Sequence, residues 1–427
     1  MKVLIVGGGG REHAIALKIK ENPEVTALYA APGNGGIAQI ATCLPFKATD
    51  VDGIVRWAAE NKMDFVIVAP DDPLCLGMVD ALAAQGIPAF GPRKNAAIIE
   101  GSKVFSKNLM KKYGIPTAAY ETFDDYDAAV KYLQTADMPI VVKADGLALG
   151  KGVLICPDRE SAVEAVASMM KEAKFGASGA RVVIEEFLTG PEVSVLAFTD
   201  GKTVKPMASS MDHKRALDHD EGLNTGGMGT IAPNPCYTPE LARRCMDEIF
   251  LPTIAAMNAE GRTFTGCLYF GLMMTPKGPK VIEYNCRFGD PETQVVLPLL
   301  KSDLLTIMRA TVDGTLADTP VEFASGAACC VVLASGGYPV SYKSGYPISG
   351  LDEAGKTATV FHAGTKLVDG QIVTAGGRVL GVTATADTLE AAIDKAYQAA
   401  DKITFTDMHM RRDIGQRALA SRKESHS

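Results

Sequence analysis

The stretch of residues 282–292 contains the side chains best suited to metal and phosphate chemistry. Because successive side chains of a strand point to opposite faces, Glu283, Asn285 and Arg287 are predicted to share one face. A carboxylate and an amide oxygen suit Mg²⁺, a hard cation that usually also binds phosphate oxygens. An arginine beside them can hold an anion next to the metal. Three polar residues could also form a solvent-exposed face, but the apolar strands around them favour a buried cleft.

A glycine-rich turn near the N-terminus predicts an anion site. An apolar run at residues 3–6 precedes four glycines at 7–10, and a helical pattern follows. The dinucleotide-binding fingerprint fails, because its third glycine would fall at Glu12 and the second predicted strand ends without an acidic residue. Backbone N–H groups at the helix start, with Arg11 beside them, suit a single phosphate instead. His13 is either a ligand contact or a capped or solvated histidine.

A second glycine-rich run predicts the tip of a β-hairpin. It is not a P-loop, because only three residues separate Gly146 from Gly150, and Gly152 rather than Ser or Thr follows Lys151. A flexible glycine hairpin with Lys143 on the preceding strand can instead close over a triphosphate. The alternative is an ordinary hairpin tip with surface lysines.

Acidic residues at the end of another predicted strand suggest a nucleoside site. Glu185 and Glu186 end this strand, and Glu192 follows a Gly-Pro turn. A segment that crosses between two lobes there could present backbone groups to an adenine edge, with Glu192 bound to a ribose hydroxyl. Two exposed acids before a turn are the alternative interpretation.

The elements that must position these residues indicate three regions. Residues 1–102 alternate apolar strands with helical stretches, as an α/β domain on a parallel sheet does. Residues 103–324 contain the hairpin and the acidic strand ends. Residues 325–427 form a separate α+β module of short strands and Gly-Gly turns. The module ends in a helix predicted at 389–402, with capping-box spacing that begins at Asp387.

The composition narrows the class of protein. The 427 residues predict roughly three domains, and 47% hydrophobic with 22% charged residues is typical of a folded globular chain. The net charge of −7 lacks the basic footprint of a nucleic-acid binder. Nine cysteines without a C-x-x-C pair indicate reduced thiols, and no apolar run reaches the ~18 residues that span a bilayer. We therefore expect a cytoplasmic enzyme without nucleic-acid or membrane partners.

Together these motifs resemble the glycinamide ribonucleotide synthetase family, ATP-grasp enzymes of purine synthesis. The resemblance runs over essentially the whole chain. It rests on ordered matches at residues 9–13, 31–34, 101–103, 142–148, 150–153, 185–187, 212–215, 224–229, 285–293 and 361–365.

The resemblance implies a multidomain α/β fold with a Rossmann-like N-terminal parallel-sheet domain, an ATP-grasp body and a small α+β C-terminal domain. The body would carry a mobile lid at about residues 118–190. The implied reaction joins glycine to 5-phosphoribosylamine with ATP, through a glycyl phosphate intermediate, and yields glycinamide ribonucleotide, ADP and phosphate. Mg²⁺ or Mn²⁺ would accompany ATP, and the chain is expected to act as a monomer.

The resemblance also assigns residues to roles. The implied metal ligands are Glu283 and Asn285, and the implied catalytic residues are Lys143, Arg287 and Asp290. ATP would contact Lys103, Lys143, Gly150, Lys151, Glu185, Glu186, Phe187 and Glu192. The substrates would contact Gly9, Gly10, Arg11, Glu12, His13, Gly33, Asn34, Asp212, Arg215 and Arg287.

Two departures from the family pattern lie at strand ends of the N-terminal domain, the crevice expected for the sugar phosphate. Gly8 stands where family members commonly have asparagine, and Asp71 stands where they commonly have glutamate. Two other functions remain open on the sequence. One is an ATP-grasp ligase that joins a carboxylate to a different amine, and the other is a nucleotide-binding sensor without turnover.

Overall fold

The computed structural model describes residues 1–148, 152–172 and 174–424. It confirms the expected mixed α/β class, with a parallel sheet at the N-terminus, two four-stranded antiparallel sheets in the middle and a five-stranded sheet toward the C-terminus, besides two two-stranded sheets. No helix within these residues combines the length and the apolar character needed to cross a membrane.

The N-terminal region is built on a five-stranded parallel sheet in the order β3-β2-β1-β4-β5. Val3 and Ile5 of the central strand pack into one hydrophobic cluster, and Leu4 and Val6 pack into another. Both faces of the sheet are therefore buried, which explains the unbroken apolar run. Its strands and helices are β1 (Lys2–Gly7), α1 (Gly10–Lys20), β2 (Ala27–Pro32), β3 (Thr42–Cys43), α2 (Val51–Glu60), β4 (Phe65–Val68), α3 (Asp71–Cys75), α4 (Met78–Ala84), β5 (Ala89–Phe90) and α5 (Lys94–Gly101).

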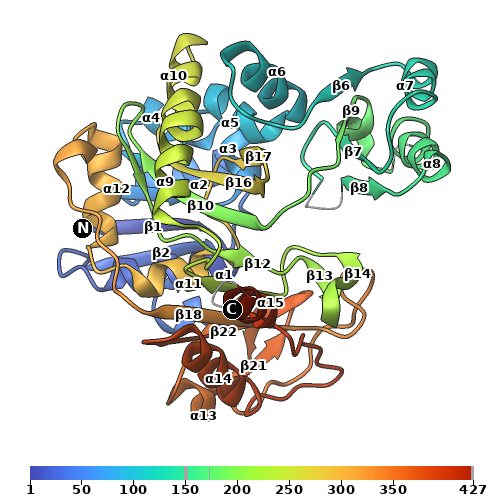
Figure 1. The fold of residues 1–427 in the computed structure, drawn as a ribbon. Helices are drawn as coiled ribbons and strands as arrows, with labels where there is room; N and C mark the ends of the chain where they lie inside the picture. The colour runs from blue at the N-terminus through green and yellow to red at the C-terminus, as the bar shows by residue number, and fades with distance from the viewer. Residues whose placement is uncertain (149–151, 173, 425–427) are drawn as a thin grey trace.

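A small antiparallel sheet in the order β6-β9-β7-β8 projects from the body at the upper right of Figure 1, with helices α7 and α8 beside it. The predicted hairpin is present: β7 pairs with β8, and Lys143 lies opposite Val153. Gly150 and Lys151 lie outside the described residues. We call this unit the outer sheet, with β6 (Tyr120–Phe123), α7 (Tyr126–Leu133), β7 (Ile140–Ala144), β8 (Val153–Cys156), α8 (Arg159–Met170) and β9 (Val182–Glu186).

A second antiparallel sheet, in the order β11-β10-β16-β17, forms the centre of the body. The predicted helix over residues 239–260 is continuous from α9 through a π-helical turn to α10. The elements around this central sheet are α6 (Lys103–Tyr113), β10 (Glu192–Thr199), β11 (Val204–Pro206), α9 (Pro239–Cys245), α10 (Leu251–Ala259), β16 (Gly266–Thr275), β17 (Gly278–Asn285), α11 (Thr293–Val296) and α12 (Leu304–Asp313).

The C-terminal sheet has the order β12-β15-β18-β22-β19, so two of its strands precede residue 325. The capping prediction for its long helix α14 was wrong in detail, because the Thr388 hydroxyl rather than Asp387 accepts the N–H of Ala391, at 3.2 Å. The remaining elements are β12 (Met211–Asp212), β13 (Arg215–Leu217), β14 (Glu221–Asn224), β15 (Gly229–Ala232), β18 (Ala327–Ala334), α13 (Leu351–Gly355), β19 (Thr359–His362), β20 (Thr365–Val368), β21 (Gln371–Thr374), β22 (Arg378–Ala386), α14 (Leu389–Ala400) and α15 (Gln416–Glu424).

Buried polar contacts join the N-terminal and C-terminal regions. The Nδ1 atom of His13 accepts the backbone N–H of His362 at 2.8 Å, and the Asn34 amide donates to the His362 carbonyl at 2.7 Å. Burial, with a smaller contribution from His362, lowers the pKa of His13 to about 3. The folded protein therefore keeps this imidazole neutral.

This buried histidine predicts a loss of stability in mild acid. Below pH 6.5 the unfolded chain binds a proton at His13 that the folded chain does not, so the unfolding free energy falls as the pH falls. We expect this residue alone to remove about 2 kcal/mol between pH 7 and pH 5. Urea unfolding at pH 7 and pH 5 measures the unfolding free energy at each pH. The difference between these two free energies should be smaller by about this amount in His13→Gln than in the parent. Equal differences for parent and variant would contradict the prediction.

Candidate active site

Glu283 on β17 lies where ammonium groups from three other segments converge. Its carboxylate is 3.4 Å from the Lys214 Nζ atom. Loss of solvent would raise the pKa of Glu283, but the charges of Lys214, Lys143 and Lys103 outweigh this effect and lower the pKa to about 2. A carboxylate that stays ionised among lysines is suited to a site that also receives phosphate and a metal cation.

Two of the predicted phosphate-binding lysines lie near Glu283. The Lys143 ammonium on β7 donates to the Ile282 carbonyl at 3.2 Å and forms an ion pair with Glu185. Lys103, at the start of α6, donates to the Gly146 carbonyl at 3.0 Å, and burial lowers its pKa. The structure therefore brings the lysines of the hairpin strand and of α6 together with Glu283.

Glu185 is a buried residue and not the exposed acid of the alternative interpretation. Its side chain is 5% exposed and lies between Lys143 and Lys107, the latter at 2.8 Å. Both oxygens of this carboxylate thus face lysines of the protein. In this structure Glu185 fixes the Lys143 ammonium, a contact that alternation along a strand could not reveal.

The segment after β9 joins the outer sheet to the central sheet. The sequence predicted such a segment, one that crosses between two lobes. Glu186, just before it, is exposed and accepts the Ala119 N–H at 3.2 Å. Phe187 is half-buried, and Glu192 at the start of β10 is exposed. These side chains lie at the junction of the two sheets.

Arg287 lies beyond β17, which ends at Asn285, so strand alternation alone does not place it. Its guanidinium nevertheless donates to the Asn285 Oδ1 atom at 2.8 Å and pairs with Glu100 at 3.1 Å. Glu100 also accepts the Cys286 N–H at 2.7 Å. Sequence reasoning missed Glu100, because nothing in the pattern of α5 links it to a strand almost two hundred residues later. The Arg287 Nε atom is buried and lacks a hydrogen-bond partner among the described residues.

The helix start that was predicted to bind a phosphate already holds carboxylates of the chain. The Gly9 N–H donates to Glu12 at 2.7 Å, and the Arg11 N–H donates to Asp290 at 3.3 Å. The Arg11 side chain also pairs with Glu12, at 2.8 Å, and donates to the Phe288 carbonyl, at 3.0 Å. These two backbone N–H groups are therefore not free to donate to a phosphate. The prediction that backbone N–H groups at the start of this helix bind a phosphate was wrong for Gly9 and Arg11.

Two further residues of the predicted substrate set shape the adjacent loop. Gly33 has a φ of +72°, and a Cβ atom there would lie 2.4 Å from the Cys43 sulfur, so only glycine fits. Asn34 accepts the Gly36 and Ile37 N–H groups and donates to the Gly8 carbonyl. These contacts hold the loop beside Gly9 and Gly10.

Asp212 and Glu292 form a second acidic group near Lys214. Burial, followed by the charge of Glu292, raises the pKa of Asp212 well above its usual value. Arg378 of β22 donates to the Asp290 carbonyl at 2.8 Å and lies 3.7 Å from its carboxylate. Sequence reasoning missed Arg378. It also gave no role to Lys214 or Glu292, although these two residues lie within motifs that match the family pattern. Arg215 instead donates to the Gly222 carbonyl within its own hairpin, at 2.8 Å.

The oxygen donors at the end of β17 suit a divalent cation that is shared with phosphate. Glu283 supplies an ionised carboxylate, and the Asn285 Oδ1 atom has a lone pair left beside Arg287. Among the described residues, groups of three or more His, Cys, Asp or Glu side chains suited to a metal are absent. Two protein oxygens with further donors from phosphates match the usual binding mode of Mg²⁺.

Comparison with known proteins and families defines the class of this protein. The biotin carboxylase domain of 2-oxoglutarate carboxylase from Hydrogenobacter thermophilus, solved with MgADP, superposes with a TM-score of 0.72 at 18% identity over 96% of this chain and 91% of that one. At this identity the likeness shows a shared fold. A family model described as the ATP-grasp (A) domain of phosphoribosylglycinamide synthetase matches residues 101–293, so the middle of the chain is an ATP-grasp domain.

Companion models complete the match, the N domain at residues 1–100 and the C domain at residues 328–417. The chain belongs to the phosphoribosylglycinamide synthetase family. Phosphoribosylamine–glycine ligase of Halalkalibacterium halodurans is 48% identical over 100% of this chain and 99% of its own length. The enzyme of that name from Agrobacterium fabrum is 49% identical over 99% and 100%. The crystal structure of the Thermotoga maritima enzyme superposes with a TM-score of 0.86 at 34% identity, over 97% of this chain and all of that one.

The buried ion pairs of Glu185 predict a large effect on stability. Glu185→Gln leaves Lys107 and Lys143 without a counter-charge, which typically costs about 3–5 kcal/mol. Glu186→Gln is the matched control, because its carboxylate is half exposed and 3.7 Å from Lys280. Urea unfolding should place the control within about 0.5 kcal/mol of the parent. If both variants lose a similar amount of unfolding free energy, the buried ion pairs of Glu185 contribute no more to stability than an exposed pair does.

Proposed function

We propose that this chain joins glycine to 5-phosphoribosylamine at the expense of ATP, giving glycinamide ribonucleotide, ADP and phosphate in purine synthesis. The family and the full-length relatives named phosphoribosylamine–glycine ligase support the reaction. The single structural observation that carries the proposal is the grouping of three lysines around Glu283: Lys214 lies 3.4 Å from its carboxylate, Lys143 donates to the Ile282 carbonyl beside it, and the charge of Lys103 also lowers the pKa of Glu283.

The charges of the cleft explain how such a reaction can proceed. The glycine carboxylate must approach the γ-phosphate, and two anions repel each other unless cations lie beside them. The lysines around Glu283 supply fixed positive charge at the place where phosphates would bind. Transfer of the γ-phosphoryl group to the carboxylate would give glycyl phosphate, and the amine of phosphoribosylamine would then attack its carbonyl and release phosphate.

We assign the nucleotide as follows. Lys103 and Lys143 hold phosphates, Glu185 holds Lys143 in place, and Glu186, Phe187 and Glu192 line the nucleoside. Mg²⁺, or Mn²⁺ in its place, would be held by Glu283 and Asn285 and would supply charge neutralisation at the phosphates. The sequence-based assignments of Gly150 and Lys151 stay predictions.

The other substrates are assigned to the side of the cleft that meets the N-terminal region. Arg287, whose buried Nε atom lacks a partner in the described chain, is proposed to hold glycine or the acyl phosphate, together with Asp290. Phosphoribosylamine is assigned to Gly9, Gly10, Arg11, Glu12, His13, Gly33, Asn34, Asp212 and Arg215. Within this set His13 and Asn34 act through the loop, because their polar atoms are bound to protein groups.

The outer sheet is proposed as the lid, at about residues 118–190, of an ATP-grasp domain at residues 103–324. The N-terminal domain would end near residue 102, and the C-terminal domain would begin at residue 325, with β12 and β15 of the middle region adding to its sheet. Glycyl phosphate hydrolyses in water, so a cover that excludes solvent favours ligation over loss of the intermediate. We further propose a cytoplasmic monomer. All nine cysteines, each in the described part of the chain, are free thiols, which is usual in a reducing compartment.

One assay separates this function from its two rivals. We expect ADP release to require glycine and phosphoribosylamine together. Release that needs glycine and a different amine would identify another carboxylate–amine ligase. Nucleotide binding without ADP release under any combination would identify a sensor. Product analysis by mass should give glycinamide ribonucleotide in the first case only.

The metal assignment predicts the behaviour of Glu283→Gln. Loss of one preorganised electrostatic contact typically lowers turnover about 10²–10³-fold. We expect that loss with little change in the melting temperature, since Glu283 and its partner Lys214 are 31% and 41% exposed and water can solvate the lysine that is left. Glu248→Gln is the control, because it makes the same change at a surface ion pair with Arg244 and should retain full turnover. A Glu283→Gln protein that melts far below the parent would make the residue structural and refute the assignment.

A further inference from the structure

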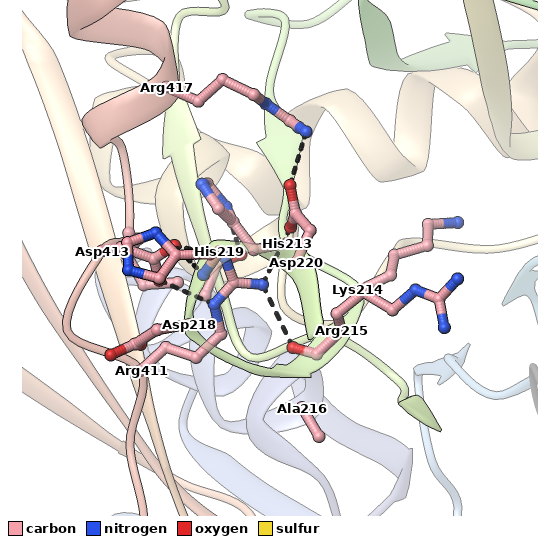
Figure 2. A network of polar contacts seen from close by, with 12 residues as sticks. His213, Lys214, Arg215, Ala216, Asp218, His219, Asp220, Arg411, Asp413 and Arg417 are labelled. Atoms are coloured by element: carbon pink, nitrogen blue, oxygen red, sulfur yellow. Dashed lines mark hydrogen bonds and ion pairs between the residues drawn. The ribbon is translucent and has the colours of Figure 1, made fainter. Parts of the chain in front are cut away.

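A buried arginine of the C-terminal segment grips the hairpin that follows Lys214. The guanidinium of Arg411 is 1% exposed. It donates to both oxygens of Asp413, each at 2.8 Å, and to the Arg215 carbonyl at 3.1 Å. It also donates to Asp220 at 3.1 Å. Figure 2 shows Arg411 between Asp413 and the hairpin residues, so one side chain spans the two ends of the segment 215–220.

Other contacts between the same two segments surround this arginine. The Gly415 N–H donates to the His213 Nε2 atom at 3.1 Å. The His219 N–H donates to Asp413 at 2.9 Å. Arg417 pairs with Asp220 at 2.8 Å. The C-terminal segment therefore holds the hairpin chain on both sides of Lys214, at position 213 and at position 215.

The backbone of the hairpin needs such support. His219 and Asp220 have φ angles of 60° and 57°, the left-handed region that residues other than glycine rarely adopt. Conformations of this kind persist when surrounding contacts over-determine them, and they often lie near functional sites. Here the supporting contacts come from Asp413, Arg411 and Arg417.

Lys214 connects this clamp to the active site. Its own carbonyl accepts the N–H and the hydroxyl of Thr225, and its Nζ atom lies 3.4 Å from Glu283. The backbone of Lys214 is thus fixed from the hairpin, while its ammonium faces the proposed metal ligand. Figure 2 shows Lys214 pointing away from Arg411, so the arginine can act on the cleft only through the chain that it holds.

We propose that Arg411 is a positioning residue, which fixes the segment 213–220 so that the Lys214 ammonium stays at Glu283 during catalysis. The expected effect of Arg411 on catalysis rests on the proposed function. The structural part of the inference, that Arg411 fixes the hairpin, does not depend on that function. Lysine cannot replace arginine here, because a single ammonium does not offer a planar fork with further donors to a second carboxylate and a carbonyl.

Arg411→Lys tests the proposal, with Arg412→Lys as the matched control. Arg412 is the adjacent residue of the same type, but its side chain is 57% exposed and pairs with Asp401, away from the cleft. We expect turnover per folded molecule to fall about 10- to 100-fold in Arg411→Lys, since small misplacements of a catalytic group have effects of this size. The KM for ATP should change less than threefold, because the other phosphate contacts remain. The control should match the parent.

Hydrogen exchange of residues 215–224 supplies a readout that needs no activity. Exchange there should become at least tenfold faster in Arg411→Lys and stay unchanged in Arg412→Lys. If Arg411→Lys does not fold, Arg417→Lys takes its place, because it weakens only the outer contact to Asp220. We then expect faster exchange and lower turnover than in the parent, with both changes smaller than those expected for Arg411→Lys. Unchanged exchange, or unchanged turnover per folded molecule beside a lower melting temperature, would overturn the proposal. If the parent protein does not release ADP in the presence of glycine and phosphoribosylamine, the proposed function is refuted. The exchange measurement would still show whether Arg411 fixes the hairpin.

Discussion

The compensation of charge among side chains that are partly or wholly withdrawn from water is the constraint on which the rest of this structure depends. Charged side chains of the cleft meet an opposite charge on a different element: Glu283 meets Lys214, Lys143 meets Glu185, and Arg287 meets Glu100. Lys143 with Glu185 and Arg287 with Glu100 are largely buried, where an isolated charge would be costly, so the elements that carry these two pairs must pack together. Glu283 and Lys214 keep 31% and 41% of their side chains exposed, so their pairing is the less demanding one. Charge pairing thus fixes β7 against β9 and α5 against the segment after β17.

The same constraint explains why all three family regions contribute to one site. Glu100 belongs to the region matched by the N domain, Glu283 to the ATP-grasp domain and Arg378 to the C domain. The C-terminal region therefore contacts Asp290, one of the residues proposed for the site, directly. Because Arg378 donates to the Asp290 carbonyl and Asp290 in turn accepts the Arg11 N–H, a chain of contacts joins β22 to the start of α1.

Local sequence patterns predicted the parts of the fold that are local in origin. The apolar run of β1, the glycine hairpin after Lys143 and the helix across residues 239–259 follow from periodicity and turn chemistry. Glu283 and Asn285 were predicted to lie together because two residues on one strand share a face, and both lie on β17. Glu100, Arg378 and the pairing of Glu185 were not found, because these contacts join elements far apart in the sequence. The Glu12 carboxylate on the Gly9 N–H has the three-residue spacing of a capping box and was open to sequence reasoning, whereas spacing could not reveal that Asp290 accepts the Arg11 N–H.

The membership of β12 and β15 in the C-terminal sheet has a consequence for synthesis of the chain on the ribosome. Residues 229–232 form their ladder with β18, which emerges about a hundred residues later. At about 5–20 residues per second, β15 waits on the order of 5–20 s with an unpaired edge, a state in which strands of neighbouring nascent chains can associate. A protein shortened before β18 would keep this open edge permanently. Aggregation of truncated chains, rather than a smaller soluble enzyme, is therefore the natural result of premature termination.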